Sequence, residues 1–249
     1  LLAELSARMD EELDYRGEAN FQRAFAAAYD GDPQFLVPKV VASSPKVVIT
    51  EWVDGTPLAQ IIKAGEQETR NLAGRLLLEF HYSSPARARL MHSDPHPGNF
   101  MLAEDGRMCV IDYGAVARLP DGIPYGLGHI IRLALDGEAT ELMRVMREHR
   151  FITAGSKVAA GDVLDYLAPF TEPLAADQFR FNRRWLQEQA ARIGDVGSKD
   201  FRTGRALNLP AEYLLIHRTT AGNTGILCQL EAEVAARDIA ERWVPGFTG

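Results

Sequence analysis

The sequence predicts an α+β protein that is mostly helical, and three observations support this fold class. Apolar residues recur at helical spacing through 1–29 and 66–83, and again through most of the C-terminal half. Two short runs rich in β-branched residues, FLVPKVV (35–41) and KVVITEWV (46–53), lie between these helices. An Asp-Gly turn inside 99–112 divides two further apolar stretches, which predicts a second pair of strands.

The C-terminal half is predicted to consist of helices separated by short breaks. Gly- and Pro-containing segments delimit helices over 122–136, 138–150, 159–168, 173–193 and 210–242. The segment GDVGSKDFRTG (194–204) is interpreted as a loop, and TAGNTG (220–225) as a break within the last helix.

Composition excludes several classes of protein. The 249 residues are 46% hydrophobic and 24% charged, as in ordinary globular proteins, and the net charge of −7 argues against a nucleic-acid groove. Cys109 and Cys228 form no CxxC pair, so we expect neither a disulfide framework nor a zinc site, and a reduced cytoplasmic setting. No apolar run approaches the roughly 18–20 residues that a membrane-spanning helix requires.

The loop HSDPHPGNF (92–100) carries the strongest functional signal. Asp94 and Asn99 are five residues apart on a segment that Pro95 and Pro97 hold extended. Asp112 ends the second predicted strand, so a hairpin would return it to the same edge as Asn99. An amide oxygen and a carboxylate are hard ligands suited to Mg²⁺, which leaves Asp94 free to face a nucleophile.

The order of these residues is that of a phosphoryl-transfer site. An Asp, an Asn five residues later, and an Asp-aromatic-Gly after a strand are the metal and base positions of protein kinases. A metal hydrolase, with His92, Asp94 and His96 as ligands, is the alternative of another class. Two histidines four residues apart can share a metal on a helix, and Pro95 and Pro97 disfavour a helix here. We therefore favour phosphoryl transfer.

HSDPHPGN followed by VIDYGAVARL resembles the catalytic loop of the UbiB/AarF family of atypical kinase-like ATPases, and EELDYRGEAN resembles that family's Glu-x-Asp element. The resemblance implies a protein-kinase-like fold, with a truncated small lobe in 1–53 and a helical large lobe in 54–249. It also implies that ATP or ADP and Mg²⁺ are cofactors.

In the small lobe, the resemblance assigns roles to five residues. Glu12 and Asp14 would form the Glu-x-Asp element, and Glu18 would be the helix glutamate that pairs with a nucleotide-binding lysine. Backbone groups near Glu51 and Val53 would contact adenine.

In the catalytic loop, the resemblance implies that Asp94 is the catalytic base and that Asn99 and Asp112 hold the metal. His92 would brace the turn, and His96 would be a second supporting residue of the loop.

The chain departs from the family pattern before Glu18. No lysine precedes Lys39, and no phosphate-covering loop is present. We expect either that the chain is part of a longer protein or that it is a natural pseudo-enzyme. In both cases residues 1–249 alone should bind nucleotide weakly and turn over slowly.

Function remains open between three possibilities. The resemblance implies an ATPase or phosphotransferase linked to isoprenoid quinone or lipid metabolism, with peripheral membrane association. The loop also resembles that of aminoglycoside-type small-molecule phosphotransferases. The third possibility is a catalytically silent scaffold that binds a hydrophobic ligand.

The basic amphipathic stretch 179–194 could meet anionic lipid, although we favour a solvated helix packed on its aromatic residues.

Overall fold

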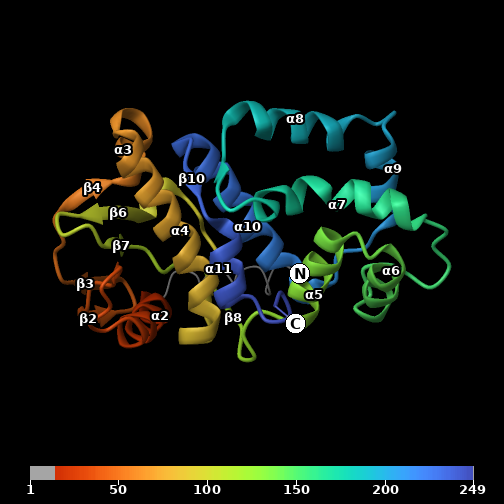
Figure 1. The fold of residues 1–249 in the computed structure, drawn as a ribbon. Coiled ribbons are helices and arrows are strands. Elements are labelled where there is room, and N and C mark those ends of the chain that lie inside the picture. Colours follow the sequence, from red (N-terminus) through yellow and green to blue (C-terminus); the bar gives the residue numbers. More distant parts are fainter. Residues whose placement is uncertain (1–14, 249) are drawn as a thin grey trace.

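Most of the described chain is helical, as predicted. The computed structural model describes residues 15–248. The helices are α2 (Tyr15–Ala28), α3 (Leu58–Ala64), α4 (Gln67–Ala88), α5 (Tyr125–Asp136), α6 (Ala139–Glu148), α7 (Ala160–Ala175), α8 (Arg183–Gly194), α9 (Lys199–Ala206), α10 (Ala211–Leu230) and α11 (Ala236–Trp243), with a short 3₁₀ turn η1 (Pro97–Asn99). A small sheet lies beside α3 and α4 on one side, and α5 to α9 lie on the other (Figure 1). None of these helices is both long enough and apolar enough to cross a membrane.

The strands are short and form one larger sheet and three pairs. In the four-stranded sheet the order is β1-β7-β6-β4, with β1 parallel to β7 and the other neighbours antiparallel. The other pairs, β2–β3, β5–β8 and β9–β10, are antiparallel. The strands are β1 (Phe35–Leu36), β2 (Val40–Ser44), β3 (Val47–Thr50), β4 (Gly55–Pro57), β5 (Leu90–His92), β6 (Phe100–Ala103), β7 (Met108–Val110), β8 (Val116–Arg118), β9 (Phe179–Arg180) and β10 (Glu233–Val234). The strand pair predicted within 99–112 is confirmed as β6–β7.

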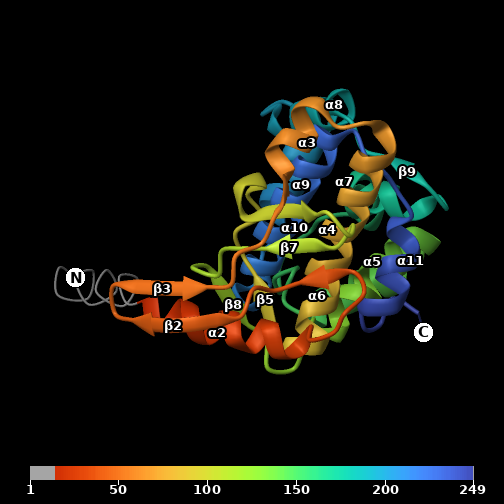
Figure 2. The ribbon, with the colours of Figure 1, turned by 90° about the vertical axis from the view of Figure 1, so that its left-hand side faces the viewer.

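The hairpin β2–β3 lies against α2 and projects away from the rest of the molecule (Figure 2). The run FLVPKVV does not form one strand. Its first residues join the four-stranded sheet as β1, and its last residues join the hairpin as β2. Pro38, which has no amide to donate to a ladder, lies between the two parts.

One continuous core joins α2 to α4, β1 and the segment after β7. Phe25, Tyr29, Phe35, Phe80 and Tyr113 are all at least 97% buried, and successive ring centroids among them lie 5.0–5.7 Å apart. Tilted and edge-to-face contacts of this kind add to the free energy of burying the rings. The core therefore fixes α2 relative to the segment that follows β7. The division of the chain at residue 53 stays a prediction.

Two predicted helices in the C-terminal half are wrong. The range 173–193 contains the end of α7, strand β9 and most of α8, because α7 continues through both of its prolines to Ala175. Pro169 cannot donate to the carbonyl of Asp165, and the Arg192 guanidinium donates to that carbonyl instead. Long-range contacts thus compensate for a local signal that would end a helix.

The predicted helix 210–242 is two helices. α10 ends at Leu230, where Glu231 adopts the left-handed conformation (φ 50°), and β10 pairs with β9 before α11 begins. The break predicted at TAGNTG is also wrong, because α10 runs through this segment without interruption. α9 lies where a loop was predicted, and the Ser198 side chain caps it by accepting from the Phe201 amide.

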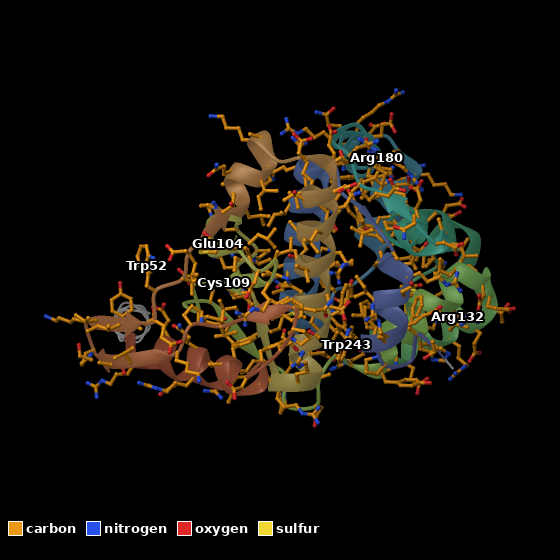
Figure 3. All side chains as sticks on the ribbon, turned by 60° about the vertical axis from the view of Figure 1, so that its left-hand side comes forward. Trp52, Glu104, Cys109, Arg132, Arg180 and Trp243 are labelled. Atoms are coloured by element: carbon orange, nitrogen blue, oxygen red, sulfur yellow. The ribbon has the colours of Figure 1, made fainter. Side chains whose placement is uncertain are left out.

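α11 is attached to α4 through a buried carboxylate. Glu79 on α4 is 2% exposed, and its Oε1 accepts a hydrogen bond from Trp243 Nε1 at 2.5 Å. Arg242 Nη2 lies 3.1 Å from the other oxygen as an ion pair. Figure 3 shows Trp243 where α11 meets α4. Burying a carboxylate is costly unless it is paired, so this contact fixes the packing of the C-terminal helix.

Candidate functional site

The loop that carries Asp94 is held in a compact turn by backbone hydrogen bonds. Ser93 N donates to Ala115 O (2.9 Å), which ties the loop to the segment after Asp112. His96 N donates to Asp94 O (2.8 Å), and Asn99 N donates to His96 O (3.0 Å). Asp94 is half-buried at the head of this turn, between β5 and η1.

Asp94 and Asn99 are in direct contact. Asn99 Nδ2 donates to Asp94 Oδ2 at 2.8 Å and to Asp94 O at 3.1 Å. Ile111 N donates to Asn99 O (3.0 Å) and closes the base of the β6–β7 hairpin, so Asp112 follows directly beside Asn99. The hairpin therefore brings the three predicted residues to one edge, as the spacing indicates.

Asp112 is oriented by two contacts. Its Oδ1 accepts from Gly114 N at 2.8 Å, and its backbone oxygen lies 2.8 Å from His92 Nε2. Within residues 15–248, its Oδ2 makes no hydrogen bond. One carboxylate oxygen is thus committed to the turn and the other is available to a ligand.

Glu18 faces Asp112 from α2. Burial raises the pKa of Glu18, and the charge of Asp112 raises it further, against an opposing hydrogen bond from the Tyr113 amide. No lysine is among the charges that shift this pKa. The carboxylate therefore meets the DYG segment, whereas the resemblance implies a lysine partner. Glu12 and Asp14 lie outside the described residues.

The two histidines of the loop point to different environments. His92 is fully buried, burial lowers its pKa, and its Nε2 donates to the Asp112 carbonyl. His96 is exposed, and its Nδ1 accepts from Gly98 N at 3.1 Å. No group of three or more His, Cys, Asp or Glu side chains that could hold a metal occurs among the described residues. The side chains therefore do not converge as the hydrolase alternative requires.

Residues 51–54 connect the β2–β3 hairpin to the four-stranded sheet. The resemblance places the adenine contact in this connection. Glu51 N donates to Lys39 O (2.9 Å), and Lys39 N donates to Glu51 Oε2 (3.0 Å), so the Glu51 amide is engaged. The Val53 backbone makes no such contact within the described residues. Trp52 is 87% exposed and projects from this connection, with Nε1 donating to Asp54 (Figure 3). The Glu51 carbonyl and the Val53 backbone are thus the groups of this pair that make no such bond within the described residues.

Gly222 on α10 is a supporting residue that the sequence did not reveal. A Cβ at position 222 would lie 2.3 Å from Pro95 Cγ, so α10 packs directly on the loop at this glycine. The sequence does contain one sign of this contact, a glycine inside an apolar helical pattern. Such a glycine can indicate close packing of another segment on the helix as well as a break in the helix. The missing side chain allows α10 to set the position of the loop.

Comparison with known proteins places this geometry in a family. The family model described as the ABC1 atypical kinase-like domain matches residues 1–146. The mitochondrial atypical kinase COQ8B of Danio rerio is 27% identical over 233 residues, which is 92% of this chain and 36% of that protein. The chloroplastic protein ACTIVITY OF BC1 COMPLEX KINASE 3 of Arabidopsis thaliana is 30% identical over 145 residues, 53% of this chain and 19% of the relative.

A solved structure is similar over nearly the whole chain. A Mycobacterium tuberculosis protein, solved as a complex with erythromycin, is 44% identical and superposes with a TM-score of 0.91. The match covers 99% of this chain and 62% of that protein. The chain therefore spans about a third or less of these two curated relatives, and under two thirds of the solved neighbour.

Proposed function

The chain belongs to the ABC1 atypical kinase-like family, also called UbiB/AarF, and from this membership we propose that its catalytic loop binds a Mg²⁺–nucleotide and supports ATP hydrolysis or phosphoryl transfer. The observation that carries the proposal is the convergence of Asp94, Asn99, Asp112 and Glu18 at one edge of the β6–β7 hairpin.

The residues at this edge fit a divalent cation. A Cβ at Gly114 would lie 3.3 Å from Asp112 Oδ1 and 3.9 Å from Glu18 Oε2, so both carboxylates border the space in front of this glycine. Two carboxylates so close repel each other, and a cation relieves the repulsion. Because Asn99 Nδ2 is committed to Asp94, its Oδ1 remains for the metal. Asn99 and Asp112 would hold Mg²⁺, which supplies charge neutralisation at the phosphates.

Asp94 is the residue of this site suited to orient the acceptor or to take its proton. Its Oδ2 is bound by Asn99 Nδ2, which fixes the carboxylate and leaves Oδ1 for a hydroxyl or a water. The Val53 backbone, at the connection to the β2–β3 hairpin, would contact the base of the nucleotide.

The relatives suggest the biological setting. The names of the curated relatives describe a mitochondrial atypical kinase and a chloroplastic kinase of the ABC1 group. We extend to this chain a kinase-like role in isoprenoid quinone or lipid metabolism, with peripheral membrane association. The solved neighbour favours a second candidate function, a small-molecule phosphotransferase, because its structure contains erythromycin.

Thermal unfolding with millimolar Mg²⁺ and ATP tests the site. We expect Tm to rise for the wild type and to stay unchanged for Asp112→Asn, since the variant loses a metal ligand. Asp105→Asn is the matched control, because Asp105 is exposed at the tip of the same hairpin and pairs with Arg107. An equal rise in wild type and Asp112→Asn would remove Asp112 from the site.

Phosphorus-31 NMR of the products separates the two candidate functions. Inorganic phosphate released from ATP without an added acceptor indicates the ATPase, whereas a phosphate ester formed only when erythromycin is present indicates the small-molecule phosphotransferase. Nucleotide binding without either product would favour the third possibility, a catalytically silent scaffold.

A further inference from the structure

A small cavity lies behind the catalytic loop, between α4, α7 and α10. Its volume is about 60 Å³, on a scale where a single water needs about 10–15 Å³. Figure 1 shows one end of α7 approaching α10 in this region. The wall includes Met91, next to His92 on β5, and also Phe170, which is 45% exposed. The cavity therefore reaches from the base of the loop to the molecular surface.

Three buried polar atoms in the wall have no hydrogen-bond partner. They are His81 Nε2, Thr219 Oγ1 and Asn223 Oδ1, on side chains that are 2%, 1% and 3% exposed. Unpaired polar groups in such positions destabilise a fold, and native structures contain few of them. Three in one wall indicate that something absent from the protein itself pairs with them.

The polarity of these atoms defines the partner. His81 Nδ1 lies 2.8 Å from the carbonyl oxygen of Leu77, so Nδ1 carries the proton and Nε2 presents a lone pair. Asn223 Oδ1 is likewise an acceptor, and the Thr219 hydroxyl can donate or accept. Of the three unpaired atoms, two are acceptors and the third can donate or accept, so a ligand with an O–H or N–H group satisfies them.

The other polar residues of the wall are paired within the protein: Tyr82 bonds the Thr220 side chain, and Thr224 Oγ1 donates to Thr220 O at 2.9 Å. The remaining residues of the wall are apolar. Side chains such as Met91, Phe170 and Leu227 leave no polar group near the mouth that could hold a charged ligand. Transfer of an ionised group into such surroundings is far more costly than transfer of a hydroxyl. A ligand with an uncharged polar end at the base and an apolar body toward Phe170 satisfies both parts of the wall.

We propose that this cavity binds the hydroxyl end of a small neutral apolar molecule, with the hydroxyl donating to Asn223 Oδ1. The site is separate from the proposed metal position at Asn99 and Asp112, and its ligand is not the nucleotide. Asn223 directly follows Gly222, which packs on Pro95, so a bound ligand would stabilise the part of α10 that supports the catalytic loop.

NMR of ¹³C-methyl methionine tests the proposal, because the Met91 methyl group lines the cavity. The probes are 1-pentanol and its isomer butyl methyl ether, which differ in whether the oxygen carries a proton. We expect 1-pentanol to shift the Met91 signal saturably and to bind at least about tenfold more tightly than the ether, since only the alcohol can donate.

Asn223→Leu should remove most of this preference for the alcohol, and Gln229→Leu, an exposed amide on the same helix, should keep it. If Asn223→Leu does not fold, Asn223→Ala replaces it. Equal binding of the two probes by the wild type would overturn the proposal, as would a preference that survives in the cavity variant. Failure of both probes to shift the Met91 signal would assign the cavity to water alone and would also overturn it.

Discussion

Glu18 and Asp112 form a pair of carboxylates whose repulsion is expected to be measurable in the free energy of unfolding. The folded-state pKa of Glu18 lies above its ordinary value of 4.5, so its contribution to stability is present below pH 4.5 and is lost as pH rises through the folded pKa. We expect Glu18→Gln to be more stable than wild type at pH 7.5, by less than about 1 kcal/mol because the group is half-exposed.

Urea unfolding with and without Mg²⁺ checks this prediction. Added Mg²⁺ should stabilise the wild type more than Glu18→Gln, because the cation offsets the repulsion that the variant lacks. A variant that is less stable than wild type at pH 7.5, with the same response to Mg²⁺, would contradict the account of Glu18.

The proximity of Asn99 and Asp112 could be predicted because the chain brings these residues together locally. Asn99 and Asp112 are joined by a single hairpin, and its Asp-Gly turn is visible in the sequence. Gly222 was not predictable, because its contact with Pro95 depends on how α10 packs across the molecule. The partner of Glu18 was likewise set by the core that fixes α2, and no local pattern encodes that packing.

At the scale of elements, α10 packs on the loop that carries Asp94, and its glycines allow a matched test. Gly222→Ala would place a Cβ 2.3 Å from Pro95 Cγ and force the loop to move, at a cost of roughly 1–3 kcal/mol. Gly225→Ala, one turn along the same helix, meets nothing within 4 Å and should add about 0.5–1 kcal/mol of stability.

Only Gly222→Ala should also reduce the Tm increase caused by Mg²⁺ and ATP, because only this glycine touches the loop. Urea unfolding gives the stabilities, and thermal unfolding gives the nucleotide response. If both variants keep the full response, α10 does not position the loop.

The attachment of α11 to α4 predicts a contrast between two tryptophans. Trp243→Phe leaves the buried Glu79 Oε1 without its donor, at a cost of about 1–3 kcal/mol. Trp52→Phe removes a similar bond to Asp54, but Trp52 is 87% exposed, so the change should stay below about 0.5 kcal/mol. Urea unfolding of both variants measures the difference, and equal effects would show that burial does not govern it.

Element boundaries were hardest to predict where long-range contacts override local signals. The two prolines of α7 mark a helix end locally, yet the helix continues and Arg192 from α8 compensates one of the lost amides. The strands β9 and β10 are two residues each, and they exist because distant segments pair. Amphipathic periodicity alone cannot reveal either feature.

The whole molecule should lose stability in mild acid because of two buried histidines. Burial lowers the pKa of His81 to about 3, and burial also lowers the pKa of His92. Near and below pH 6.5 these histidines bind protons in the unfolded chain but stay neutral in the folded protein. The free energy of unfolding therefore falls as pH drops from about 6.5 toward 3. Between about pH 6.5 and 3, the His81 contribution approaches a slope of about 1.4 kcal/mol per pH unit, and His92 adds a slope of the same sign.

Urea unfolding between pH 7.5 and 4.5 measures this slope. His81→Phe should reduce the slope below pH 6 by about 1.4 kcal/mol per pH unit, whereas replacement of the exposed His217 by Asn should leave the slope unchanged. A slope that is the same in wild type and His81→Phe would show that His81 is not held neutral by the fold.

The central claim is that Asp112 binds the metal of a nucleotide, and electron–nuclear double resonance of Mn²⁺ tests it directly. Mn²⁺ replaces Mg²⁺ at oxygen sites, and protein labelled with ¹³C in the aspartate carboxyl groups reports direct coordination. With Mn²⁺ and ATP, the account predicts a strong ¹³C coupling in the wild type and in Asp105→Asn, and its loss in Asp112→Asn. A coupling that persists in Asp112→Asn, or that is absent from the wild type, would contradict the claim.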